Sequence, residues 1–148
     1  MRLSTKAQYA VQAMIRLNIE QQHSEPVSLR AISAQENISL AYLEQLFAKL
    51  RRGHLVTSVR GPGGGYVLAR SADKILLDQI VDCVDETLVP VSCMDESGNC
   101  NCTERCVAHN VWLELGSRIR DFLSSVSIED ITRAATNVSG LNSDSKEG

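Results

Sequence analysis

Residues 28–70 carry the pattern that most restricts the fold, because two short helical segments are followed there by two short extended ones. Ser28 and Ser39 each stand directly before a helical apolar pattern, where a serine oxygen can accept hydrogen bonds from free backbone N–H groups. Gly53 follows a basic last turn and predicts the end of the second helix. That helix places one apolar face inward: Leu40, Leu43, Leu46, Phe47 and Leu50.

The extended segments cover roughly 54–60 and 66–70, where Val, Thr, Tyr and Leu favour strands. A glycine-rich turn, Gly61-Pro62-Gly63-Gly64-Gly65, joins them. A helix pair followed by a hairpin predicts a winged helix-turn-helix. Ser4 or Thr5 begins a further helix before it. The fold class is therefore mainly α with a small β-hairpin wing, and the first domain spans 1–75.

The second half of the chain predicts helices and one cysteine-rich loop. A helix near 77–84 leads into a loop over about 89–103, and Thr103 is the expected cap of a long helix over 103–126. The apolar stripe of that helix is too long to be covered by such a small domain, so we expect a homodimer through it. Ser127 and Asp130 resemble a capping box for a short sixth helix. This second domain spans 76–136, and 137–148 is expected to be a disordered tail.

Charge is unevenly distributed along the chain. Residues 1–70 hold nine Lys or Arg and four acids, a net +5, whereas the remainder has a net −8. A basic half suits a polyanionic partner such as double-stranded DNA. No apolar run approaches the length of a membrane span, and no signal peptide is evident, so we expect a cytoplasmic protein without a membrane partner.

The second helix of the pair would lie in the major groove of DNA. Gln45 can bind adenine through two hydrogen bonds, and Glu44 can accept one from cytosine N4. An arginine at the base of a side-chain-free wing tip can enter a narrow groove, although a glycine-rich hairpin can also be a solvated loop. The residues predicted to contact DNA are Arg2, Ser39, Ala41, Tyr42, Glu44, Gln45, Lys49, Arg51, Arg60, Gly61, Gly63 and Gly64.

Four of the five cysteines and one histidine lie between residues 93 and 109. Cys106 and His109 are three apart, so they share a helical face. With Cys93 and Cys100 they supply three thiolates and one imidazole, which suits a 2Fe–2S cluster or tetrahedral zinc. The spacing does not separate these two, and Cys102 is an alternative to Cys100. Cys83 is expected to be a small buried residue.

No enzyme is expected. The chain has no Ser-His-Asp pattern and no Cys-x-x-Cys, and its glycine run lies between strands rather than before a helix. No small-molecule substrate is therefore predicted.

Several of these segments together resemble the IscR-type iron–sulfur cluster regulators, within a broader family of winged-helix bacterial repressors. The resemblance covers about residues 1–132 and is closest at Met1-Arg2-Leu3, Ile38–Phe47, Ser58–Tyr66, Val84-Asp85-Glu86 and Cys106-x-x-His109-x-x-Trp112. It implies a homodimer on promoter DNA that represses cluster-assembly genes. It also implies a 2Fe–2S cluster on Cys93, Cys100, Cys106 and His109.

Two departures from the family pattern concern the ligands. The gap from Cys93 to Cys100 is one residue longer than usual, and Cys102 is extra. Two alternatives therefore stay open. The first is a repressor of the same family that senses nitric oxide, iron or thiol oxidation. The second is a constitutive DNA-binding protein stapled by zinc.

Overall fold

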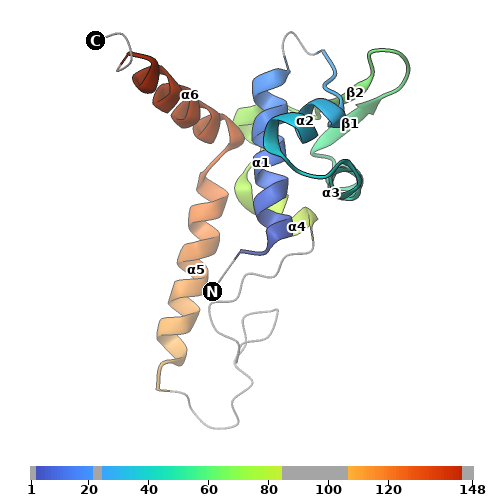
Figure 1. Cartoon of the computed structure of the whole chain (residues 1–148). Helices are drawn as coiled ribbons and strands as arrows, with labels where there is room; N and C mark the ends of the chain where they lie inside the picture. Colours follow the sequence, from blue (N-terminus) through green and yellow to red (C-terminus); the bar gives the residue numbers. More distant parts are fainter. Residues whose placement is uncertain (1–2, 22–24, 85–106, 145–148) are drawn as a thin grey trace.

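The computed structural model describes residues 3–21, 25–84 and 107–144. It is mainly α-helical with one antiparallel hairpin, as the sequence predicts (Figure 1). In chain order the elements are α1 Thr5–Glu20, α2 Leu29–Glu36, α3 Leu40–Arg52, β1 Val56–Val59, β2 Gly65–Leu68, the 3-10 turn η1 Ala72–Lys74, α4 Leu77–Cys83, α5 His109–Ser125 and α6 Ile128–Asp144.

Serine caps begin the first three helices. The hydroxyl oxygens of Ser4, Ser28 and Ser39 each accept a hydrogen bond, at 3.2 Å, from the backbone N–H three residues further on. Each such cap stabilises its helix by about 1 kcal/mol. Asn37 ends α2 in the left-handed region, with φ 55°, which sets the tight turn into α3.

Helix α1 runs through the middle of the molecule, with α2 and α3 on one side and α5 and α6 on the other (Figure 1). Its buried residues are mostly alanines, and small side chains let neighbouring helices approach closely. An ion pair at 2.8 Å between Arg16 and Glu36 also joins α1 to α2. The centre of the core is formed by Met14, Leu17, Ile32, Leu43, Leu46, Phe47 and Leu50.

The hairpin pairs Val56 with Leu68 at one end and Val59 with Gly65 at the other. Val27, just before α2, adds a bridge to Tyr66 through two backbone hydrogen bonds of 2.9 Å. The wing is thus bonded directly to the start of the helix-turn-helix.

The end of α3 differs in detail from the expectation. Gly53 caps the helix, as predicted, but its φ is −80°, and the left-handed residue is His54 with φ 62°. The N–H of His54 donates to Arg51 O and that of Leu55 to Leu50 O, both at 3.0 Å, which is the Schellman pattern. The side chain of His54 is exposed.

Two predicted boundaries are wrong. The long helix begins at His109, after a turn at 107–108, and not at Thr103, which lies outside the described residues. Its N-cap is Ala108, which has no side-chain acceptor, so nothing in the pattern marked this start. Helix α6 continues to Asp144 rather than ending before Asn137, so the expectation of a short sixth helix is also wrong. The helical spacing of apolar residues continues through Ala134, Val138 and Leu141, which explains the longer helix.

The junction of α5 and α6 is fastened to the segment before α4. Leu77 N–H donates to Val126 O and Ile128 N–H to Ile75 O, both at 3.0 Å. Ser127 and Asp130 form the predicted capping box, with hydrogen bonds of 3.0 and 3.1 Å. The side chain of Ile128 is fully buried in the core.

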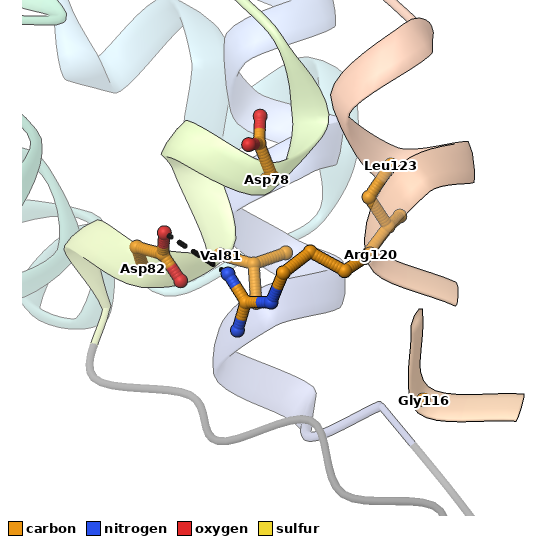
Figure 2. A pocket seen from close by; sticks show the side chains of 6 residues that line it. All are labelled: Asp78, Val81, Asp82, Gly116, Arg120 and Leu123. Atoms are coloured by element: carbon orange, nitrogen blue, oxygen red, sulfur yellow. Dashed lines mark ion pairs between the residues drawn. The ribbon is translucent and has the colours of Figure 1, made fainter. Parts of the chain in front are cut away.

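Helix α5 itself contacts the body through α4. Figure 2 shows Arg120 reaching toward Asp82, with the ion pair at 3.9 Å, while Leu123 of α5 is buried beside Val81 of α4. The remainder of α5 extends beyond the body of the domain (Figure 1). None of the helices in the described parts of the chain has the length and apolarity needed to cross a bilayer.

Candidate nucleic-acid interface and ligand segment

The face of α3 opposite the core presents the residues predicted to read bases. Ala41, Glu44 and Gln45 are exposed. On the other face the predicted inward residues are buried except for Leu40, which is half-buried. Because the buried face is fixed by packing, the exposed face has a fixed direction. An exposed helix surface of this kind fits the major groove.

Two other residues that are predicted to contact DNA also form contacts within the fold. The Ser39 oxygen accepts the capping hydrogen bond from Tyr42 N–H. The half-buried Tyr42 ring meets Tyr9 of α1 edge-on, with centroids 5.7 Å apart. Both residues therefore hold the start of α3 in place, in addition to any contact with DNA.

The wing tip is a tight turn. Gly64 N–H donates to Gly61 O at 2.9 Å, and Gly61 and Gly63 have φ of 104° and 73°. Proline at the second turn position with a positive φ at the third is typical of a type II turn. No side chain projects from the tip except that of Pro62, and Arg60 at its base is exposed. This geometry suits close approach to a groove.

Gly65 is a positioning residue that the sequence analysis missed. A Cβ atom on it would overlap the carbonyl group of Val27 and crowd Ser28 N. Only glycine lets β2 lie this close to the start of α2. Next to it, the Tyr66 ring meets Phe47 of α3, with centroids 4.9 Å apart. The wing is thereby fixed relative to α3. The contact joins residues far apart in sequence, so no local signal identified it.

The basic character of residues 1–70 is partly used inside the fold. Arg16 pairs with Glu36 and Glu20, at 2.8 and 3.2 Å. Arg70 donates to Gln79 Oε1 at 2.7 Å and to Lys74 O at 3.2 Å. Near the end of α3, Arg51 and Arg52 are exposed, and Lys49 is half-buried.

Most of the predicted ligand residues fall outside the described part of the chain. These are Cys93, Cys100, Cys102 and Cys106, together with the predicted DNA contact Arg2. His109 is the first residue of α5 and is half-buried. Within residues 3–21, 25–84 and 107–144, no three His, Cys, Asp or Glu side chains are grouped to hold a metal.

Helix α5 carries an uncovered apolar stripe. Val111, Leu115 and Phe122 are 59%, 39% and 63% exposed, and their spacing of four and seven puts them on one face. The starts of α1 and α4, together with Leu123 of α5, form a groove of about 240 Å³. None of the residues that line the groove is charged. They are Leu3, Ala7, Gln8, Val11, Gln12, Leu77, Val81 and Leu123. A surface this apolar is typical of a protein–protein contact.

Comparison with known proteins gives consistent matches over most of the chain. Residues 3–134 match the Rrf2 family, described as iron-dependent transcriptional regulators. ORF2 of Azotobacter vinelandii, described as an HTH-type transcriptional regulator, is 50% identical over 88% of this chain and 79% of its own length. The regulator IscR of Xenorhabdus nematophila is 44% identical over 90% of this chain and 80% of its own length.

Among solved structures, the IscR of T. potens is similar, with a TM-score of 0.74 and 34% identity. The match covers 91% of this chain and 88% of that one.

Proposed function

Because the chain belongs to the Rrf2 family of transcriptional regulators, we propose that it senses iron–sulfur clusters and changes its affinity for promoter DNA accordingly. It acts in the cytoplasm as a repressor of cluster-assembly genes. One observation carries the proposal: α4 and His109 bracket a segment with four cysteines, and α4 packs against the same core as the reader helix α3.

The donor set fits a 2Fe–2S cluster. Cys93, Cys100 and Cys106 supply thiolates and His109 an imidazole, so four protein ligands are available. Cys102 is the alternative to Cys100. The cluster, when bound, supplies a redox-active and oxygen-sensitive iron centre. His109, in the first turn of α5, joins that centre to the long helix.

On DNA, the reader helix and the wing act together. Gln45 and Glu44 contact base edges, and Glu44 also repels sequences that leave its carboxylate unpaired near phosphates. Ser39, Ala41 and Tyr42 lie at the start of the same helix. Lys49 and Arg51 bind phosphates, as does Arg2 at the chain start. Arg60 enters the adjacent groove while Gly61, Gly63 and Gly64 approach the backbone.

The active species is a homodimer. The exposed stripe belongs to α5, and Leu123 of the same helix lines the apolar groove. In a two-fold interface the same surface of each protomer meets its copy, so one chain must carry both the stripe and the groove. A second copy of α5 would cover Phe122 and the groove together. The division into a winged domain over 1–75 and a sensing and dimerisation part over 76–136 follows from this assignment.

The test is reconstitution under anaerobic conditions. The wild-type protein should bind iron and sulfide in near-equal amounts and show visible absorbance, while Cys106→Ala should stay colourless and dimeric. Cys100→Ala and Cys102→Ala, compared side by side, identify the loop ligand, because only one of them should lose the cluster. Zinc without iron, or a colourless wild-type protein, would exclude cluster sensing.

A further inference from the structure

Cys83, the last residue of α4, packs against the backbone at the end of the reader helix. A Cβ atom on Gly53 would overlap the Cys83 Sγ atom. A side chain at position 53 would therefore have to displace this thiol, whereas the φ of −80° at Gly53 suits any residue. The half-buried thiol fits the place where a side chain at position 53 would otherwise lie.

Both sides of this contact are held firmly. On the α3 side, the Gly53 N–H donates to Lys49 O at 3.0 Å, in the last turn of the helix that carries Gln45, and the Schellman hydrogen bonds follow directly after it. On the α4 side, Val81 and Val84 are buried in the core at 2% and 0% exposure. A displacement of the end of α4 is thus passed on to α3 because packed interiors transmit strain.

We propose that Cys83 and Gly53 are positioning residues for DNA reading, and that their contact passes the state of the sensor to the reader helix. The second part rests on the proposed function, because α4 runs directly into the segment 85–106 that carries the candidate cysteine ligands. The contact between Cys83 and Gly53 holds the reader helix in the position that fits the major groove. A displacement of the end of α4 changes that position.

A double-mutant cycle tests the positioning role in the cluster-free dimer. Gly53→Ala should lower operator affinity by at least about fivefold, the lower end of ordinary coupling between sites. Adding Cys83→Ala should restore it, because the nearest remaining atoms would be Cys83 Cβ at 3.5 Å and Leu50 O at 3.6 Å. Cys83→Leu, which enlarges the contact from the other side, should weaken operator binding like Gly53→Ala.

Each variant is also measured on non-operator DNA at low salt and by thermal unfolding, to separate positioning from loss of fold. Wild-type operator affinity in Gly53→Ala, or no recovery in the double variant, would overturn the positioning role.

The sensing role is tested by the ratio of operator affinities with and without the cluster. Cys83→Ala should bring this ratio toward one while leaving cluster binding intact, as judged by absorbance. An unchanged ratio in Cys83→Ala would overturn the coupling. A ratio of one in the wild-type protein would instead contradict the proposed function, and the cluster-free cycle would still decide the positioning role.

Discussion

At the residue scale, α3 separates side chains that read bases from side chains that add affinity. Gln45 is exposed in the middle of the helix, and Arg51 is exposed in its last turn. An amide can form two directed hydrogen bonds with adenine, whereas a guanidinium on a phosphate carries no sequence information. Replacing each of the two residues should therefore change DNA binding in a different way.

Gln45→Ala should lower operator affinity and remove the preference for one base pair, worth about 1–3 kcal/mol. Arg51→Gln should weaken operator and non-operator DNA alike and reduce the salt dependence by about one counterion per protomer. Binding titrations against a set of single-base operator variants, at several salt concentrations, distinguish the two. If Gln45→Ala kept the full base preference of the wild-type protein, this assignment of roles would be wrong.

The role of a residue could be predicted from the sequence where that role depends on neighbours close by in the chain. The serine caps at 28 and 39 and the exposed Gln45 depend on neighbours within one helical turn. The contacts of Gly53 with Cys83 and of Gly65 with Val27 join distant segments. Glycine has no side chain to reveal its partner, so the sequence could mark these positions as turns but not explain them.

At the scale of elements, the wing depends on Gly65. Gly65→Ala should push β2 away from Val27, since the added methyl meets backbone atoms that cannot turn aside. We expect destabilisation of about 1–3 kcal/mol and loss of the wing contact with DNA. Urea unfolding and operator titration measure the two effects. Thr57→Ala, an exposed change in the same hairpin, is the matched control. Equal behaviour of the two variants would contradict the role of Gly65.

The capping box of α6 makes the stability of the protein depend on pH. Hydrogen bonds from the backbone N–H and the hydroxyl of Ser127 hold the pKa of Asp130 below its ordinary value of 3.8. The folded pKa is therefore lower than the unfolded one, so the cap stabilises the protein fully above about pH 4. The contribution is lost as pH falls through the folded pKa.

Asp130→Asn removes the charge, and it should destabilise the cluster-free protein at neutral pH. The difference from wild type should shrink as pH is lowered below 4, as followed by urea midpoints. A difference that stayed constant across this range would show that the carboxylate charge plays no part in the cap.

The two wrong element boundaries have a common cause. Sequence pattern finds the middle of a helix better than its end, and neither end here carries a strong signal. Thr103 resembled a cap, yet α5 begins after Ala108, which has no capping side chain. The polar composition from Asn137 suggested disorder, although apolar residues still recur at helical spacing.

At the scale of the whole molecule, the proposed DNA-binding species consists of two chains that meet through α5. Phe122→Asp places a charge at one end of the uncovered stripe of α5, on its most exposed side chain, and it should convert the dimer to a monomer. Ser117→Asp, on another exposed face of the same helix, should leave the dimer intact. Sedimentation at several protein concentrations measures both. A Phe122→Asp protein that sediments as the wild type would place the interface elsewhere.

We propose that a cluster held next to α5 sets the affinity of the paired reader helices for DNA. The most direct measurement is the operator affinity of one anaerobic preparation before and after its cluster is removed. We predict a change of roughly 5- to 150-fold, the usual range for coupling between two sites. Cys106→Ala should bind like the cluster-free form throughout. Equal operator affinities of the loaded and cluster-free wild-type dimers would contradict the account.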